Sequence, residues 1–258
     1  MSIPFYKYNG TGNDFIIMDN RDQKFDASNS ELIHQLCTRH FGIGADGLIL
    51  LENEVGYDFK MVYFNSDGKE STMCGNGGRC IIRFAHDLKL IGNHTHFSAI
   101  DGPHLGKVFD SVISLQMQDV SDIEVNDQRV ELDTGSPHYV AFMDELPGKE
   151  FVQIAGEIRR NAPYTEKGIN VNFASIKNEK ITMRTFERGV ENETLACGTG
   201  ATAVAISAFH TGKVSGTDIQ VKVMGGDLNV RFDSDKSGYS NIWLTGPAEF
   251  VFEGKIDI

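Results

Sequence analysis

The sequence has no surplus of positive charge and no long apolar run. Its 24 Lys and Arg stand against 36 Asp and Glu, which gives a formal net charge of -12. A nucleic-acid-binding surface is normally basic, so we expect no nucleic-acid partner. No apolar stretch reaches the length of a membrane span, and the first residues show no basic segment followed by an apolar one. We therefore expect no membrane partner, no secretory signal and a cytoplasmic location.

Cysteine is scarce, with four in 258 residues. That number is too small for a disulfide scaffold, and it fits a reducing compartment in which thiols stay available for chemistry. The sequence lacks a Cys-x-x-Cys pair and a His-Glu-x-x-His motif, and no lysine carries a mark of pyridoxal attachment. We therefore expect no metal and no cofactor.

Two of the cysteines lie in nearly the same local sequence. One segment is Met73-Cys74-Gly75-Asn76-Gly77, and the other is Ala196-Cys197-Gly198-Thr199-Gly200. The offset of 123 residues between them also places Thr11-Gly12-Asn13 on Thr134-Gly135-Ser136, and Tyr63 on Phe186. This spacing predicts an internal duplication with one thiol in each half.

The apolar pattern predicts an α/β (α+β) fold with many short strands and few helices. Alternating residues indicate half-buried strands, among them 59–63, 113–117, 181–186, 219–223, 228–232, 242–244 and 250–252. Helical patterns cover about 30–39, 76–90 and 199–211, and the last two are apolar or small nearly all round, as buried helices are. We expect two pseudo-symmetric halves, 1–119 and 120–246, each a mostly antiparallel strand barrel or sheet around a central buried helix.

The position of the two cysteines suggests acid–base chemistry. Each lies at the predicted start of a helix, where backbone N–H groups have no partner within the helix and the dipole is positive. Such a place stabilises a thiolate and can hold a substrate carboxylate. One thiolate could then remove the proton from a carbon next to a carboxylate, while the other thiol protonates the opposite face. Two such groups would invert a stereocentre.

Other motifs have simpler interpretations. The alternative for Cys74 and Cys197 is that both are ordinary buried cysteines, which is the interpretation we favour for Cys37 and Cys80. Gly42-Ile43-Gly44-Ala45-Asp46-Gly47 matches a dinucleotide-binding string, but it follows a helix and precedes a strand, so we interpret it as a turn.

The chain closely resembles the diaminopimelate epimerases, which are cofactor-independent amino-acid epimerases. The matching segments run through most of the sequence: 12–15, 41–47, 64–68, 73–77, 170–171, 187–189 and 196–200. The resemblance implies an isomerase that converts LL-diaminopimelate to the meso form, on the route to lysine and peptidoglycan precursors. It also implies a homodimer, and a C-terminal strand, about 247–258, that returns to the first half.

The same resemblance implies roles for individual residues. Cys74 and Cys197 would be the acid–base pair, and His138 and Glu187 would assist them. The carboxylate at the reacting carbon would be held by Gly75, Asn76, Gly198 and Thr199. The rest of the substrate would be recognised by Asn13, Asn65, Asn170, Glu187 and Arg188, with Arg188 at the remote carboxylate.

Two departures and two alternatives stand beside this interpretation. Many family members have Asn where Ser136 stands and Gln where Gly47 stands, so neither position is carried over as a binding residue. A related proline or hydroxyproline racemase is one alternative, although such enzymes typically have Cys-Gly-His where this chain has Asn76. A catalytically idle, ligand-binding member is the other.

Overall fold

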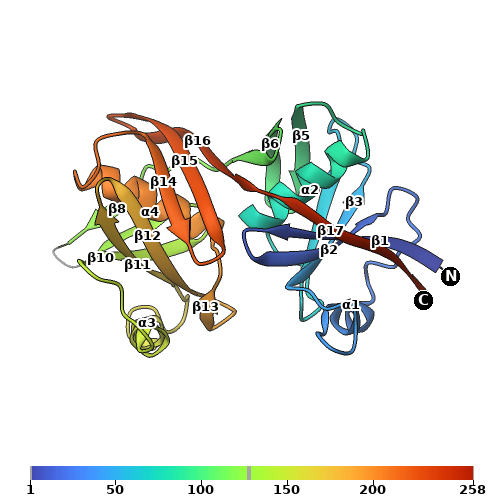
Figure 1. Ribbon diagram of the computed structural model, residues 1–258, viewed down its shortest axis with the longest axis horizontal. Coiled ribbons are helices and arrows are strands. Elements are labelled where there is room, and N and C mark those ends of the chain that lie inside the picture. Colours follow the sequence, from blue (N-terminus) through green and yellow to red (C-terminus); the bar gives the residue numbers. More distant parts are fainter. Residues whose placement is uncertain (1, 127–128, 258) are drawn as a thin grey trace. The chain divides into compact units, whose positions relative to one another are not determined.

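The computed structural model describes residues 2–126 and 129–257, and the chain divides into two compact units (Figure 1). Unit 1 consists of Met1–Leu115 and Gly246–Ile258, and unit 2 consists of Gln116–Thr245. The division expected from the sequence places residues 120–246 in the second half. The observed second unit begins and ends slightly earlier along the chain.

Unit 1 is built from strands with two helices. Its elements are β1 (Ser2–Gly10), β2 (Asn13–Asp19), α1 (Ser30–Cys37), β3 (Gly47–Glu52), β4 (Lys60–Asn65), α2 (Gly75–Asp87), β5 (His94–Ala99), β6 (Gly102–Phe109), β7 (Val112–Gln116) and β17 (Glu249–Asp257). The last strand, β17, pairs antiparallel with β1. The first and last strands of the chain are therefore neighbours in one sheet.

Unit 2 has a similar order of elements. These are β8 (Ile123–Val125), β9 (Val130–Asp133), β10 (Pro137–Phe142), α3 (Phe151–Arg160), β11 (Asn170–Lys177), β12 (Lys180–Glu187), β13 (Asn192–Thr194), α4 (Gly198–His210), β14 (Asp218–Val223), β15 (Gly226–Asp235) and β16 (Gly238–Pro247). None of the helices in the described parts of the chain is long and apolar enough to cross a membrane.

The two units share one pattern of strand directions. In unit 1, β2–β3 and β4–β5 are parallel, while β1–β2, β3–β4 and β5–β6 are antiparallel. In unit 2, β10–β11 and β12–β14 are parallel, while β9–β10, β11–β12 and β14–β15 are antiparallel. The duplication seen in the sequence is therefore a duplication of topology, and the expected α+β architecture is confirmed.

The strand register supports the offset of 123 residues on one strand pair and corrects it on the next. Phe15 lies opposite Gly47 in unit 1, and His138 lies opposite Asn170 in unit 2, which matches the offset at both positions. Tyr63, however, lies opposite Ile49, while the residue opposite Asn172 is Thr185. The counterpart of Tyr63 in the ladder is thus Thr185, and the predicted match of Tyr63 with Phe186 is wrong by one residue.

Each unit surrounds one buried helix. Helix α2 packs against β1, β2, β3, β4, β6 and β17, and α4 packs against β9, β10, β11, β12, β14 and β15 (Figure 1). Ala201, Ala203, Ala205 and Ala208 are all buried in α4, because a helix enclosed by strands has no solvent face to fill with polar residues. The two predicted buried helices are confirmed, beginning one residue earlier than expected.

Helix α3 has no counterpart among the predicted helices. Its buried residues are Phe151, Ala155 and Gly156, while Ile154 is partly exposed, so its apolar stripe is narrow. Its N-cap residue, Glu150, makes no capping hydrogen bond through its side chain. The local signals that mark a helix in sequence are therefore weak here, and packing against β11 and β12 stabilises the segment.

Candidate active site

Cys74 and Cys197 begin the two central helices in the same way. Each is the N-cap residue of a 13-residue helix, has an extended backbone conformation and makes no capping hydrogen bond through its side chain. Neither cysteine is in a disulfide, and Cys74 is half-buried while Cys197 is buried. The N–H groups of the first helical turn point toward the thiol side and favour a negative charge there.

The other two cysteines differ in their surroundings. Cys37 and Cys80 are buried in packed interior, and burial raises the pKa of each thiol to about 12. Both therefore remain protonated, and their predicted role in core packing is confirmed. Reactive cysteines need access and a neighbourhood that favours the thiolate.

In unit 1, hydrogen bonds link several polar side chains next to the first turn of α2. The buried Asn76 donates through Nδ2 to Asn13 Oδ1, and its Oδ1 accepts from Arg79 Nη2 at 2.9 Å. Asn13 in turn donates to Asp46 Oδ2 at 2.9 Å. The predicted site residues Asn13 and Asn76 are thus held together and oriented by hydrogen bonds within unit 1.

Arg79 is a buried cation that sequence analysis did not single out. Its side chain is fully buried, and it donates to Thr11 Oγ1 at 2.7 Å and to Gly75 O at 3.2 Å. Burial lowers its pKa to about 10. Its place among small and apolar residues, between Gly78 and the Cys80-Ile81-Ile82 stretch, was the available signal. Arg79 thus places a positive charge within electrostatic range of the Cys74 thiol.

Asn65 and Gly47 lie together at the edge where β4 ends and β3 begins. Asn65 is exposed, and its Oδ1 accepts from the Tyr63 hydroxyl at 2.8 Å. A Cβ on Gly47 would lie 2.6 Å from Tyr63 Cε2 and 2.6 Å from Phe64 O. The Tyr63 ring therefore occupies the space in which a longer residue at position 47 would begin.

In unit 2, the first turn of α4 is tied to the loop before β10. Cys197 Sγ lies 3.4 Å from Thr199 Oγ1, and Thr199 O accepts from Thr134 Oγ1 at 2.8 Å. Gly200 follows with its backbone against Cys197 and Asn172. Gly198 and Thr199 thus lie at the second thiol, as predicted from the repeated motif.

Asn170, Ser136 and Arg188 form a second hydrogen-bonded group in unit 2. Asn170 Nδ2 donates to Ser136 Oγ at 2.9 Å, and its Oδ1 accepts from the Arg188 backbone N–H at 2.8 Å. The Arg188 guanidinium donates to Ser136 Oγ at 3.4 Å and to Lys167 O at 3.1 Å, and remains exposed. Ser136, which departs from the family pattern, is therefore a partner of two predicted site residues. Glu187, beside Arg188, ends β12.

His138 is fully buried on β10. Burial, and then the positive charge of Arg188, lower its pKa to about 3, so the imidazole is neutral near pH 7. Its Nδ1 lies 3.0 Å from Asn172 Nδ2. Asn172 is a further residue that sequence analysis missed.

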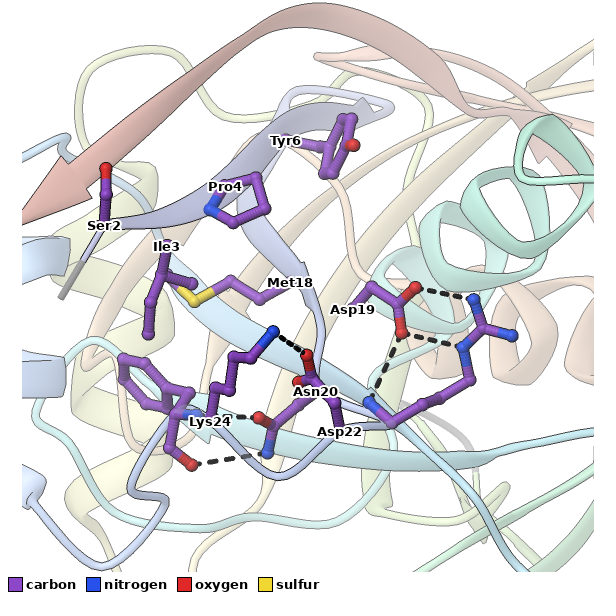
Figure 2. A pocket seen from close by; sticks show the side chains of 11 residues that line it. Ser2, Ile3, Pro4, Tyr6, Met18, Asp19, Asn20, Asp22 and Lys24 are labelled. Carbon is purple, nitrogen blue, oxygen red and sulfur yellow. Dashed lines mark hydrogen bonds and ion pairs between the residues drawn. The ribbon is translucent and has the colours of Figure 1, made fainter.

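A separate cavity of about 470 Å³ lies in unit 1 and contains none of the predicted site residues (Figure 2). It lies where Ser2, Pro4 and Tyr6 of β1 face Met18 of β2 and the segment after it. Its cations are neutralised, because Arg21 pairs with Asp19 at 2.6 Å and Lys24 pairs with Asp22 at 2.5 Å. Elsewhere in residues 2–126 and 129–257, no three His, Cys, Asp or Glu side chains group as metal ligands would.

Solved structures similar to this one share its fold at low sequence identity. A phenazine biosynthesis protein of the PhzF family from Bacillus anthracis matches with a TM-score of 0.75 and 14% identity, covering all of both chains. A probable proline racemase from Agrobacterium radiobacter matches with a TM-score of 0.67 and 14% identity, covering 99% of this chain and 93% of the other. These likenesses concern architecture alone.

Sequence comparisons are more specific. The family model for diaminopimelate epimerase matches residues 5–102 and 130–251. The diaminopimelate epimerase of Flavobacterium psychrophilum is 53% identical, with 97% of this chain and 99% of the relative covered. That of Chlorobaculum tepidum is 42% identical, with 96% and 99% covered. Identity at this level over nearly the whole of both chains shows that the chain belongs to the diaminopimelate epimerase family.

Proposed function

We propose that the protein interconverts LL-diaminopimelate and meso-diaminopimelate, in the formation of lysine and peptidoglycan precursors. The observation that carries the proposal is the repeated helix start, with Cys74 and Cys197 as N-cap residues of equivalent central helices. One such thiol could serve a hydrolase or a redox enzyme. Two in equivalent positions suit a reaction that treats the two faces of one carbon alike.

In the proposed reaction, one cysteine acts as a thiolate and takes the α-proton onto its sulfur. The other acts as a thiol and gives its proton to the opposite face of the same carbon, so that one proton enters for each that leaves. The reverse direction exchanges the two roles. The carboxylate of the reacting carbon would accept hydrogen bonds at Gly75 and Asn76 and at Gly198 and Thr199, where helix N-termini stabilise the negative charge that develops.

Recognition of the second amino-acid end would rest on the remaining polar residues. Arg188 offers an exposed guanidinium that can form a forked pair with a carboxylate, and Glu187 can accept from an ammonium group. Asn170 and Ser136 hold the Arg188 backbone and side chain. Asn13 and Asn65 would complete the contacts from unit 1. A proline-type substrate has no second carboxylate for Arg188.

The test is exchange of solvent deuterium into the α-carbon of added substrate, followed by mass spectrometry. We expect exchange with LL-diaminopimelate and none with proline, and unchanged rates after treatment with a chelator or a carbonyl reagent. Exchange with proline alone would assign the chain to the racemase alternative. Silence with both would leave the idle, ligand-binding alternative in place.

We also propose that the chain forms a homodimer and works in the cytoplasm, where both thiols stay reduced. Strand β17 exposes a run of apolar side chains, with Phe250 50% and Phe252 44% exposed. Their rings contact Tyr8 and Phe5 of β1 on one side, which leaves the other side in solvent. Clustered exposed apolar groups favour association. Sedimentation should report a dimer that Phe252→Glu dissociates, while Val55→Glu, at a fully exposed control position, leaves it intact.

A further inference from the structure

Unit 2 contains a buried polar group where unit 1 is apolar. His138 and Asn172 are fully buried and Thr185 is nearly so. The unit 1 counterparts of His138 and Asn172 are Phe15 and Ile49, which are buried and apolar, whereas the counterpart of Thr185 is Tyr63, whose hydroxyl donates to Asn65. The same topology is therefore built once with hydrocarbon side chains and once with an imidazole and an amide.

This difference has an energetic consequence. A buried polar group destabilises the fold unless hydrogen bonds compensate it, and even then it stabilises less than a well-packed apolar side chain of similar size. Unit 1 shows that the fold does not need polar residues at these positions. A role other than folding is therefore the simplest reason for His138 and Asn172.

Hydrogen bonds determine the orientation of the Asn172 amide. Its Nδ2 donates to Tyr139 O at 3.0 Å and lies 3.4 Å from Asn170 O. Carbonyl oxygens only accept, so the amide nitrogen has to face them. On the other side, Asn172 Oδ1 accepts from Thr185 Oγ1 at 2.9 Å. Rotating the amide by half a turn would set its oxygen against two carbonyl oxygens.

The amide orientation in turn determines where the His138 proton lies. Asn172 Nδ2 is a donor and lies 3.0 Å from His138 Nδ1, so Nδ1 accepts a hydrogen bond and carries no proton. In the neutral ring, the proton is then on Nε2. That nitrogen is buried and has no hydrogen-bond partner within residues 2–126 and 129–257.

The group lies beside the second thiol. A Cβ placed on Gly200 would be 2.6 Å from Asn172 Oδ1 and 3.3 Å from Cys197 Sγ. Asn172 and Cys197 therefore border the same small volume at the first turn of α4. Strand β10, which bears His138, also packs against α4.

We propose that Asn172 is a positioning residue that keeps His138 in its neutral Nε2–H form, and that Thr185 holds Asn172 in this orientation. The inference rests on the proposed two-thiol reaction. It makes His138 Nε2 a hydrogen-bond donor and leaves Nδ1 engaged by Asn172, so that neither ring nitrogen is available as a base. Unit 1 has no equivalent device, since Phe15 and Ile49 can neither donate nor accept.

The first test measures the protonation of His138 directly. In ¹⁵N-labelled full-length protein, correlation spectra of the imidazole nitrogens should show His138 with Nε2 protonated and Nδ1 unprotonated. His138→Phe identifies the signal, and His210, whose Nδ1 lies 2.8 Å from the Tyr239 hydroxyl, serves as an internal reference. A protonated Nδ1 on His138 would overturn the proposal, whatever the activity of the protein.

The second test is Asn172→Asp, which keeps the shape of the side chain and replaces the donor by an acceptor. We expect the proton of His138 to move to Nδ1 and kcat for deuterium exchange to fall about ten- to a hundredfold, with KM changed less than about threefold. Full activity together with an unmoved proton would sink the positioning role. Absence of exchange in the unaltered protein would instead contradict the proposed function.

Thr185 provides a second approach should Asn172→Asp fail to fold. Thr185→Val removes the hydroxyl that holds Asn172 Oδ1, whereas Thr185→Ser keeps it. We expect Thr185→Val to lower kcat several-fold in the same direction as Asn172→Asp, and Thr185→Ser to restore most of it. Thr182→Val, on the same strand and half-buried, controls for the loss of a hydroxyl from β12. Equal rates for the Val and Ser variants at position 185 would contradict the proposal.

Discussion

Helices α2 and α4 begin alike but differ in the polar side chains that are buried near their first turns. Behind the Cys74 end is Arg79, a buried cation bonded to Thr11, Asn76 and Gly75. At the position of Arg79, α4 has Thr202, whose hydroxyl donates to Gly198 O at 3.0 Å within the helix.

Behind the Cys197 end the polar element is different. It is the uncharged pair of His138 and Asn172, on strands whose unit 1 counterparts carry Phe15 and Ile49 at the same places. The buried polar group near the helix start is thus a cation in unit 1 and a neutral imidazole with its amide partner in unit 2. Duplication preserved the backbone and the thiols, while the surrounding charges diverged.

The largest effect is expected from removing the thiols that the two units share. Cys74→Ala and Cys197→Ala should each slow epimerisation about 10²–10⁴-fold, since each thiol would serve one face of the carbon. Circular dichroism and thermal melting check that the fold persists, and Cys37→Ala, in the core, should retain turnover. Near-normal turnover in either thiol variant would contradict the two-thiol scheme.

Replacing Arg79 and its positional counterpart Thr202 tests how much each side chain stabilises the fold. Arg79→Met should destabilise the protein by about 2–4 kcal/mol, because Thr11, Asn76 and Gly75 O would lose a charged donor inside the core. Thr202→Val should change stability by less than about 1 kcal/mol, since its hydroxyl bonds only a carbonyl of its own helix. Denaturant unfolding measures both. Equal losses of stability in the two variants would mean that the hydrogen bonds of Arg79 contribute little to the stability of the fold.

The two units also differ in the space around the glycine in the first turn of each central helix. A Cβ on Gly200 would lie 2.6 Å from Asn172 Oδ1, which hydrogen bonds hold in place, whereas on Gly77 it would lie 3.2 Å from the end of the Ile49 side chain. Gly200→Ala should therefore cost about 1–3 kcal/mol. Gly77→Ala should be close to neutral, because gained helix propensity offsets mild crowding. Unfolding midpoints of the two variants give the answer directly.

The smallest effect concerns pH. The pKa of His138 is about 3 in the folded protein because of its burial, well below the value of 6.5 for an unfolded chain. Between these values the unfolded state binds a proton that the native state does not, so stability falls as the pH falls through this window. His138 should account for about 1 kcal/mol of that loss between pH 6 and pH 5. His138→Phe, which copies Phe15, should remove this part of the slope.

The offset between the two halves of the sequence indicates one helix that the apolar periodicity does not. Helix α3 was not predicted from its own residues, yet α1 shifted by 123 residues covers 153–160, and α3 ends at Arg160. Conversely, the same shift misplaced Tyr63, because the β11–β12 pairing slips by one residue relative to β3–β4. Periodicity is a local property, whereas the register between strands is decided by packing across the sheet.

Residues that touch no ligand in the family pattern were the hardest to predict. Arg79 and Asn172 escaped notice because an arginine in a helix and an asparagine in a strand are each usually on the surface. Their burial follows from enclosure of α2 and α4 by strands on several sides. Ser136 was set aside as a departure from the pattern, and the structure makes it the hydrogen-bond partner of Asn170 and Arg188.

The duplication, the strand-rich architecture and the position of both thiols at helix starts can all be predicted from the sequence. These follow from spacing and alternation, which need no knowledge of distant contacts. Which polar groups are buried near each thiol, and how they are oriented, follows only from the tertiary structure. Arg79 bonds Thr11, and Asn172 bonds His138, across 68 and 34 residues of chain. Hydrogen bonds between residues so far apart in the sequence form only once the strands have assembled, because folding decides which acceptor lies next to each buried donor.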